Sequence, residues 1–318
     1  MKWKKLGQIF QFDKTPLTKI FESHSQSPQA VVFDSFIRVY FSTRTRDKTG
    51  KFLSHVQYVD YTRDFETILG FSNHEVIRLG ESGCFDEHGI FPASPLKMND
   101  KIYAYTTGWT RRKSVDVDSS IGLAISNDGG STFIKHGDGP VLSTSLFEPF
   151  LVGDGFVRKY KDKYYMFYVF GERWCSTTVE NSPQRVYKIG VSISDDGINW
   201  RKMNKKIITD VIDENECQAL PTVVKIGTQY HMYFCFRHMS GFRTDSAKGY
   251  RLGYAFSDDL TTWQRDDSLS GLNPTEGQWD SDMMCYPHIF KVGNQIYMLY
   301  NGNEFGKHGF GLAILEGT

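Results

Sequence analysis

Acidic side chains recur at similar places along this chain of 318 residues. Glu87, Glu216 and Asp282 each stand five positions before a proline. Further carboxylates lie close to these positions, namely Asp86, Glu148, Asp154 and Asp280. Two carboxyl groups that face each other across a site can divide the acid and base roles in breaking a glycosidic bond. The acidic positions therefore suggest chemistry on saccharides.

Residues suited to holding a saccharide follow a second set of positions. Arg44, Arg237 and Asn303 each stand three positions after a repeated aromatic residue, and Trp109 and Glu172 come one position later in two further copies. Carboxylate and amide groups hydrogen-bond to hydroxyls, while an indole face stacks on the C–H face of a sugar ring. We therefore expect one group of side chains to bind substrate, namely Arg44, Glu87, Trp109, Glu172, Arg237, Asp280, His288 and Asn303.

The elements that must position these residues repeat along the whole chain. Five aromatic residues close short runs of alternating apolar residues and lie 64, 63, 66 and 66 residues apart, namely Phe41, Tyr105, Tyr168, Phe234 and Tyr300. Thirteen positions before each stands a proline or a glycine, namely Pro28, Pro92, Gly155, Pro221 and Pro287. A period held over a whole chain is typical of a repeat architecture.

Each repeat contains the pattern of four short β-strands. In the third repeat, residues 156–160 and 164–168 are joined by a polar turn, which is typical of a β-hairpin. A third strand, such as residues 189–194, then leads into another turn and a further aromatic residue. We predict an all-β, five-bladed β-propeller with four antiparallel strands per blade, as one domain over residues 1–318. The blades are expected at approximately residues 24–80, 85–140, 148–210, 214–270 and 279–318, with residues 3–10 as the strand that closes the last blade.

Antiparallel strands determine which loops share an end of such a fold. The stretch from Ser126 to Phe133 resembles an Asp-box and lies between a third and a fourth strand, so we expect it to brace that turn. The candidate acidic and basic residues lie at the opposite end, where first strands begin and second strands end. We therefore expect them to converge on one site.

Charge and cysteine content argue against several classes of function. The 37 basic and 37 acidic residues give a formal net charge of zero, which argues against a nucleic-acid or anionic-membrane partner. The basic N-terminus is not followed by the apolar segment of a signal peptide, and no run approaches the ~20 apolar residues of a membrane span. The five cysteines include no CxxC pair, which fits reduced thiols in a cytoplasmic protein without a metal site or cofactor.

Several stretches resemble the five-bladed propeller glycosidase superfamily, namely residues 85–94, 121–129, 279–287, 298–303 and 309–313. This superfamily contains the arabinanases and xylosidases of glycoside hydrolase family 43, the β-fructosidases of family 32 and the mannoside phosphorylases of family 130. The chain is most similar to an uncharacterised glycosidase-like branch, and the resemblance covers nearly all of it. It implies an intracellular carbohydrate-active enzyme that cleaves or transfers a glycosidic bond.

The resemblance also implies roles for individual carboxylates. In the hydrolases, an aspartate of the first blade is the base or nucleophile and a glutamate is the general acid. Here residues 24–29 of the first blade contain no carboxylate. Glu216 matches the glutamate, and Asp86, Asp154 or Asp282 is expected opposite it as the base or charge partner.

Other functions stay open. Basic residues hold inorganic phosphate in the family-130 phosphorylases, and Arg44, Arg46, Arg237 and His288 could do so here. The same groups could hold a substrate carboxylate, or the diphosphate of a nucleotide-linked sugar in a glycan-biosynthesis enzyme, or could pair with the acids. The missing first-blade carboxylate also fits a non-catalytic glycan-binding propeller. The expected partner is a saccharide or a sugar phosphate.

Overall fold

The chain folds almost entirely into β-strands, as its sequence predicts. The structure is a computed structural model that describes residues 1–178 and 180–317. Within these residues lie twenty strands and one short α-helix, α1 (Asn303–Gly306). Four 3-10 helices connect strands, at Phe12–Lys14, Pro16–Lys19, Ser246–Lys248 and Asp267–Leu269.

The strands form five units of four in the described residues. The first two units are β2 (Ser23–Val32), β3 (Ile37–Arg46), β4 (Phe52–Tyr61) and β5 (Ile68–Phe71), then β6 (Gly89–Met98), β7 (Lys101–Arg111), β8 (Val117–Ser126) and β9 (Ile134–Lys135). The third and fourth are β10 (Val152–Tyr160), β11 (Lys163–Cys175), β12 (Gln184–Ser194) and β13 (Arg201–Lys202), then β14 (Cys217–Ile226), β15 (Gln229–Arg237), β16 (Arg251–Ser257) and β17 (Gln264–Arg265). The fifth combines β18 (Cys285–Val292), β19 (Gln295–Asn301) and β20 (Gly309–Leu315) with β1 (Trp3–Gln11).

Pairing is antiparallel within every unit. A single parallel pair, Ser54 with Gly89, joins the first two units into one eight-stranded sheet, and the other units are separate four-stranded sheets. Strand β1 pairs with β20 from Trp3 opposite Leu315 to Gln11 opposite Gly309. The N-terminal strand therefore completes the last sheet, as the sequence predicts.

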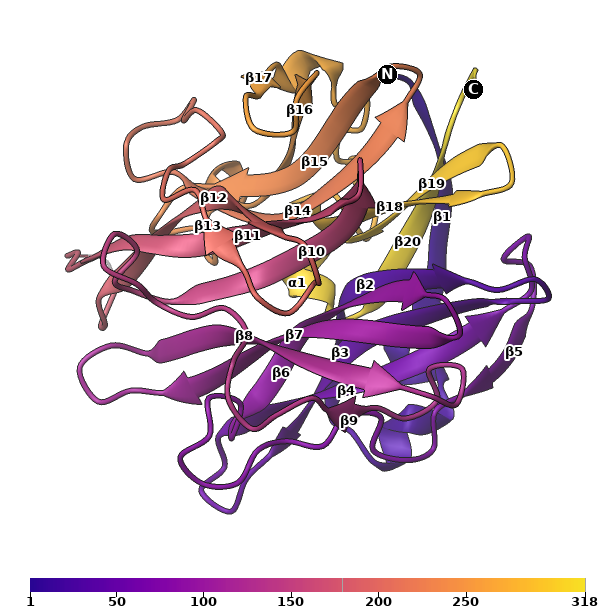
Figure 1. Cartoon of the computed structure of the whole chain (residues 1–318), viewed down its shortest axis with the longest axis horizontal. Coiled ribbons are helices and arrows are strands. Elements are labelled where there is room, and N and C mark those ends of the chain that lie inside the picture. Colours follow the sequence, from indigo (N-terminus) through magenta and orange to yellow (C-terminus); the bar gives the residue numbers. More distant parts are fainter. Residues whose placement is uncertain (179, 318) are drawn as a thin grey trace.

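The first strands of the units contact one another in a cyclic order. Strand β2 contacts β6, which contacts β10, and the order continues through β14 and β18 back to β2. Figure 1 shows β2, β10, β14 and β18 converging near the middle of the molecule, beside α1, while β5 and β17 lie at its periphery. The first strands therefore surround the centre of the fold.

The repeated aromatic residues form part of the core. Phe41, Tyr105, Tyr168, Phe234 and Tyr300 lie on the second strands of their units and are each at most 2% exposed. Tyr105 also donates a hydrogen bond of 2.9 Å to the Gly197 carbonyl of the next unit. The repeat therefore reflects one buried position that packs between neighbouring sheets.

Every first strand carries a bulge at its repeated proline or glycine. The register shifts between Gln26 and Gln29, Ile90 and Ala93, Gly153 and Phe156, Ala219 and Thr222, and Cys285 and His288. Proline cannot donate a ladder hydrogen bond, so a bulge is one of the few places where a sheet accepts it. In four units the residue before the proline or glycine has a positive φ, at Ser27 (55°), Asp154 (54°), Leu220 (47°) and Tyr286 (58°). The bulges turn these residues out of the normal strand alternation.

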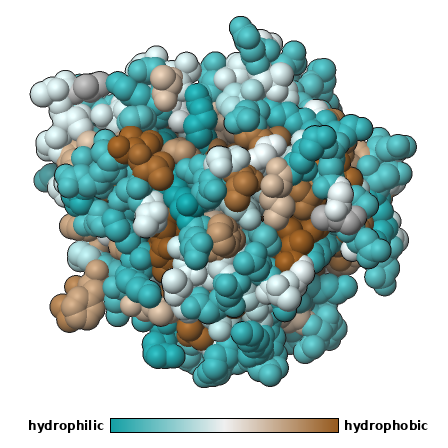
Figure 2. Space-filling view, turned by 90° about the horizontal axis from the view of Figure 1, so that it is seen from above, coloured by the Kyte–Doolittle hydropathy of each residue, from teal (hydrophilic) through white to brown (hydrophobic). Residues whose placement is uncertain are grey.

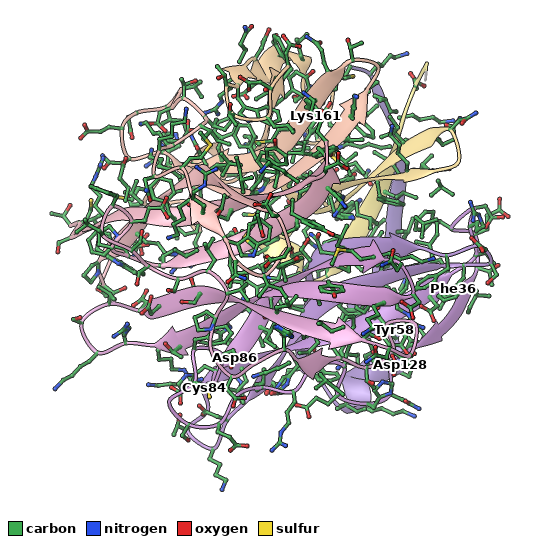
Figure 3. All side chains as sticks on the ribbon, in the orientation of Figure 1. Phe36, Tyr58, Cys84, Asp86, Asp128 and Lys161 are labelled. Carbon is green, nitrogen blue, oxygen red and sulfur yellow. The ribbon has the colours of Figure 1, made fainter. Side chains whose placement is uncertain are left out.

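The Asp-box turn lies away from these bulges. Asp128 accepts hydrogen bonds from Ser126 (2.7 Å) and from the backbone and hydroxyl of Thr132 (3.0 and 2.6 Å). Although burial raises it, these bonds lower the pKa of Asp128 to about 2. Figure 3 shows Asp128 and Asp86 toward opposite ends of the strands of the second unit. The Asp-box residues therefore brace their own turn, as predicted.

The outer surface is mixed in character. On the face shown in Figure 2, hydrophobic residues form small groups separated by hydrophilic ones. Among the residues that the structure describes, no helix is long and apolar enough to cross a membrane.

Candidate active site

All five units contribute to one central pocket of about 400 Å³. One residue beside each bulge lines it, namely Gln26, Phe91, Asp154, Ala219 and Tyr286. Its charged residues are Arg44, Asp154, Arg185, Arg237 and Arg243. The pocket therefore lies at the end of the fold where the sequence predicts a site, but it is lined by four cations and one carboxylate.

Asp154 is placed in the pocket by the bulge of β10. Its backbone N–H donates to the Thr107 hydroxyl (2.7 Å), and its carboxylate accepts one hydrogen bond from the Leu220 backbone (3.2 Å). Burial raises the pKa of Asp154 to about 7, against the opposing effects of the Leu220 hydrogen bond and the Arg185 charge. Near neutral pH this carboxyl group can therefore both donate and accept a proton.

The four arginines come from three different units. Arg44 lies on β3, Arg185 on β12, Arg237 on β15 and Arg243 in the loop after β15. Arg44 donates to the amide oxygen of Gln26 through Nε (3.2 Å) and Nη2 (2.9 Å). Arg237 is 3% exposed and donates to the carbonyls of His238 (2.7 Å) and Met239 (3.0 Å). These bonds hold two guanidinium groups at the pocket without neutralising either charge.

Aromatic side chains form the wall behind Arg237. Its Nη2 donates to the Tyr187 hydroxyl (2.9 Å), which also hydrogen-bonds to the Tyr250 hydroxyl (2.5 Å). The Phe242 ring lies 3.5 Å from the Arg237 guanidinium, and Phe305 of α1 packs edge-on against Phe242. Such cation–π contacts fix the orientation of a buried guanidinium.

Trp109 lines another part of the same pocket. Its ring stacks on His88, with ring centroids 5.9 Å apart and planes at 27°. The Trp109 ring also packs closely over Gly89, where an added Cβ would lie 2.4 Å from the indole nitrogen. This packing holds the indole in place, so it can offer an apolar surface to a sugar ring.

Four of the candidate carboxylates form buried ion pairs instead of lining the pocket. Their partners all lie on the fourth strand of the same unit, in the pairs Asp86–Lys135 (2.5 Å), Glu148–Lys202 (2.6 Å), Glu216–Arg265 (2.5 Å) and Asp280–Lys5 (2.5 Å). Each carboxylate side chain is at most 1% exposed. The pairs therefore tie the fourth strand of a unit to the segment that leads into its first strand.

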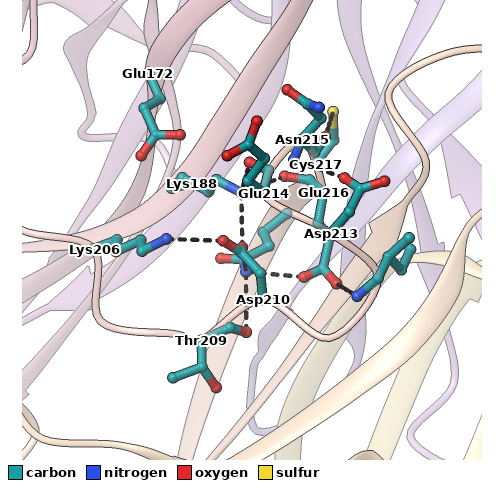
Figure 4. A network of polar contacts seen from close by, with 12 residues as sticks. Glu172, Lys188, Lys206, Thr209, Asp210, Asp213, Glu214, Asn215, Glu216 and Cys217 are labelled. Atoms are coloured by element: carbon teal, nitrogen blue, oxygen red, sulfur yellow. Dashed lines mark hydrogen bonds and ion pairs between the residues drawn. The ribbon is translucent and has the colours of Figure 1, made fainter.

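Glu216 is held especially firmly. Its carboxylate accepts hydrogen bonds from the backbone of Val211 (3.0 Å) and Ile212 (3.1 Å) as well as from the Arg265 guanidinium. Figure 4 shows Glu216 inside a network in which buried Lys188 binds the Glu216 carbonyl and Asp210. A carboxylate enclosed in this way cannot contact a substrate in the central pocket.

The remaining predicted residues lie outside the central pocket. Glu87 contacts the His88 ring (3.2 Å), and Glu172 pairs with Arg173 (2.8 Å). Asp282 is exposed and lies with Asn303 in a separate surface pocket that includes Trp279. His288 is fully buried below the bulge of β18, where it stacks on Phe290, and burial lowers its pKa well below the usual range.

The structure therefore does not bring Glu87, Glu216 and Asp282 together. The first strands begin at different distances from these carboxylates: Glu216 directly precedes β14, whereas Asp282 lies three residues before β18. Residues at the same distance from the repeated proline therefore do not occupy equivalent places in the structure. Of the predicted residues, Arg44, Trp109, Asp154 and Arg237 line the pocket.

Sequence reasoning missed several pocket residues. Arg185 and Arg243 lie outside the repeat positions that were compared, and no spacing signal marks them. Phe91 and Tyr286 do share a signal with the predicted residue Asp154, since each directly precedes its repeated proline or glycine. Within residues 1–178 and 180–317, no group of three or more His, Cys, Asp or Glu side chains could hold a metal ion.

Solved structures share this fold. The chain is similar to a glycoside hydrolase (TM-score 0.73, 14% identity, covering 99% of this protein and 93% of the other). A second similar structure comes from work on the GH130 family of mannoside phosphorylases, a family that contains glycoside hydrolases targeting β-1,2 mannosidic linkages in Candida mannan. Its TM-score is 0.67 at 14% identity, and the match covers 98% of this protein and 93% of the other. A thermostable family-43 glycoside hydrolase matches with a TM-score of 0.63 and 15% identity over 92% and 89%. At these identities the likenesses show the fold alone, and they confirm that this protein shares the fold of the solved glycosidases that its sequence resembles.

Closer relatives come from Mycobacterium tuberculosis. The uncharacterized proteins MT1551, from strain CDC 1551 / Oshkosh, and Rv1502, from strain H37Rv, are each 31% identical over 320 residues. The matches cover 99% of this chain and 100% of both relatives. The chain belongs to the same family as these two proteins. No profile of a known protein family matches it.

Proposed function

We propose that the five units are the blades of a closed five-bladed β-propeller. The cyclic contacts of β2, β6, β10, β14 and β18 support this. Only a closed arrangement brings β18, the first strand of the fifth unit, into contact with β2, the first strand of the first unit. The pairing of β1 with β20 supports it further, since it links the two ends of the chain within one blade.

We further propose that the protein is a carbohydrate-active enzyme that cleaves or transfers a glycosidic bond in the central pocket. The single observation that carries this proposal is Asp154, a pocket carboxyl group with a pKa near 7 on a strained bulge. Perturbed acids of this kind cluster at catalytic sites, as does backbone strain. The glycosidase-like fold and the indole of Trp109 beside the same cavity support a saccharide as substrate.

Asp154 acts as the general acid in this proposal. It donates its proton to the glycosidic oxygen while the bond from that oxygen to the anomeric carbon breaks. An external oxygen nucleophile forms the new bond at the anomeric carbon. Among the described residues that line the pocket, Asp154 is the one carboxylate, so the nucleophile is a bound anion, or water that releases its proton to solvent, rather than a second side chain.

Substitution of Asp154 tests this function. We expect the wild type to release sugar from at least one member of a panel of oligosaccharides and glycosyl phosphates, assayed with and without inorganic phosphate. Asp154→Asn keeps the shape but cannot donate the proton, so kcat should fall by roughly 10² or more. Asp282→Asn is the matched control, because Asp282 is exposed and lies in the separate surface pocket. Full turnover by Asp154→Asn would refute the assignment.

A glycan-binding protein without catalysis is the second candidate. The observation that favours it is the single carboxylate, since most glycosidases use two. In that case wild type and Asp154→Asn would bind the same saccharide, and neither would turn it over.

A further inference from the structure

The central pocket contains four guanidinium groups that form no ion pair with a carboxylate of the described residues. The ion pairs of the described arginines involve Arg38, Arg46, Arg78, Arg111, Arg112, Arg173 and Arg265, all outside the pocket lining. The one carboxylate of the lining, Asp154, forms no ion pair with the four arginines in these residues, and its pKa of about 7 leaves it about half protonated at neutral pH. The empty pocket therefore has an excess of about three to four positive charges.

These charges lie close enough to repel one another. Burial and the neighbouring charges of Arg237 and Arg185 lower the pKa of Arg243. Burial and the charge of Arg243 likewise lower the pKa of Arg44. Arg185 and Arg237 thus disfavour the charged form of Arg243, and Arg243 disfavours that of Arg44, which is costly in a partly desolvated cavity. Although burial opposes it, nearby thiol and tyrosine groups raise the pKa of Arg237 itself. A bound anion with two or more charges would relieve this repulsion.

The unused hydrogen-bond donors point to the same kind of ligand. The Nε of Arg237 is buried and has no hydrogen-bond acceptor in the described residues. Arg185 is partly buried and Arg243 is exposed, and neither side chain forms a hydrogen bond to these residues, so their donors are open to a ligand in the pocket. Buried donors are rarely left without an acceptor. A guanidinium presents a planar fork of N–H groups that matches the oxygens of a phosphate.

Resting on the proposed function, we propose that the saccharide substrate carries a phosphate ester or diphosphate, which Arg44, Arg185, Arg237 and Arg243 bind in the central pocket. A phosphate group offers up to two charges and three oxygens, whereas a sugar carboxylate offers one charge and two oxygens. The excess of positive charge matches the phosphate better. The aromatic wall behind Arg237 holds this side chain in place before the ligand binds.

Calorimetric titration at constant ionic strength tests the proposal, with inorganic phosphate, glucose 1-phosphate, uridine diphosphate and glucuronate as probes. We expect glucose 1-phosphate or uridine diphosphate to bind saturably at millimolar concentration or below, and at least about tenfold more tightly than glucuronate. Tighter binding of inorganic phosphate than of both esters would overturn the assignment of the phosphate to the substrate. Tighter binding of glucuronate than of the phosphate compounds, or no binding of any phosphate compound, would refute a substrate that carries a phosphate ester or diphosphate.

Two single variants show whether the pocket is responsible. Arg243→Met and Arg185→Met remove a charge from side chains that do not support neighbouring backbone, so they should fold and should weaken binding about tenfold or more. Arg78→Met is the control, because Arg78 is a surface residue, 76% exposed and paired with Glu81. Wild-type affinity in both pocket variants would refute the site.

Asp154→Asn separates this proposal from the enzymatic function. This variant should bind the phosphate compounds at least as tightly as the wild type, since it removes a negative charge from the pocket. Phosphate binding without turnover by the wild type would contradict only the enzymatic function. Turnover of neutral saccharides without phosphate binding would contradict only the anionic substrate.

Discussion

Asp154 combines three features that rarely occur together in one residue. It has a positive φ on a bulge, its carboxylate accepts one hydrogen bond in the described residues, and its charge is only partly compensated by Arg185. A surface aspartate would normally be ionised at neutral pH without such cost. The fold therefore maintains this residue in a state that is unfavourable for stability.

The unfavourable state of Asp154 predicts a specific pH dependence of stability. Its pKa rises from 3.8 to about 7 on folding, so the folded state binds more protons than the unfolded state in this window. The contribution of Asp154 to the free energy of unfolding is therefore fully present below about pH 4. It falls by up to about 4 kcal/mol as the pH rises to about 7 and above. In Asp154→Asn this loss should be absent.

Urea unfolding of both proteins at about pH 5 and about pH 8 measures this effect. Relative to the wild type, the free energy of unfolding of Asp154→Asn should rise by roughly 3 kcal/mol from about pH 5 to about pH 8. Comparing the two proteins at each pH cancels the titration of other groups, such as His24 and His88, whose pKa values burial lowers. An equal difference in stability at both pH values would show that the Asp154 pKa is not raised.

The residue scale is also where sequence reasoning is weakest. Spacing places Asp154 and Glu216 at equally plausible positions, yet one lines the pocket and the other is enclosed by Arg265 and the backbone of Val211 and Ile212. The partner of Glu216 lies 49 residues later in the sequence, so no local pattern reveals the pair. A bulge also reverses which side a side chain faces. The repeated proline or glycine marks its place, but the sequence does not show which neighbouring residue turns into the pocket.

At the scale of elements, the buried ion pairs explain how very short fourth strands are held. Strands β9, β13 and β17 have two residues each, too few for stable pairing alone. Each supplies the cation, Lys135, Lys202 or Arg265, that reaches the carboxylate before the first strand. In the third and fifth units a tyrosine hydroxyl of the second strand joins the pair, from Tyr168 (2.7 Å) and Tyr300 (3.2 Å). The pairs thus connect the outer and inner strands of a unit.

Glu216→Gln should therefore affect stability rather than chemistry. The substitution removes one of the two carboxylate partners of the buried Arg265 guanidinium and leaves Asp267 (2.8 Å), so the loss should cost roughly 2 kcal/mol of unfolding free energy. Turnover per folded molecule should stay near that of the wild type, because Glu216 lies outside the central pocket. Denaturant unfolding and active-site-normalised kcat measure the two quantities.

Two further variants control for this interpretation. Replacing both partners, Glu216→Met with Arg265→Met, should recover most of the stability, because the one charge left without its partner, Asp267, is partly exposed (23%). Glu316→Gln removes the exposed pair with Lys2 and should change stability little. Loss of turnover in a fully folded Glu216→Gln protein would return Glu216 to the catalytic site.

At the scale of the whole molecule, sequence reasoning is more successful. The aromatic and proline repeats predict the all-β fold, the four-strand units and the place of β1, because a buried position repeated in every unit leaves a regular trace. The arginines of the pocket leave no such trace. Arg243 lies in a loop, and Arg185 has no counterpart in the other units. Features shared by all units are thus readable from the sequence, whereas features of one unit depend on the folded structure.

Strand β1 is the element on which the whole arrangement should depend most. Trp3 is 7% exposed and donates to the Tyr233 hydroxyl of the fourth unit (2.9 Å), and Phe10 stacks on Phe310 of the fifth, with centroids 4.7 Å apart. Trp3→Ala should therefore lower the unfolding free energy by roughly 3 kcal/mol or more. Leu6→Ala is the control within the same strand, because Leu6 is 43% exposed and should tolerate the change.

Deletion of residues 2–11 extends this prediction, since it leaves β20 as an unpaired edge strand that can associate with other chains. Size-exclusion chromatography should show aggregates, and an added peptide of residues 1–11 should restore the elution volume of the wild type by pairing with β20, as edge strands commonly bind extended peptides. A truncated protein that elutes and unfolds like the wild type would show that β1 is dispensable. That result would also remove the pairing of β1 with β20 as support for the proposed closed propeller, because the fold would then be stable without it.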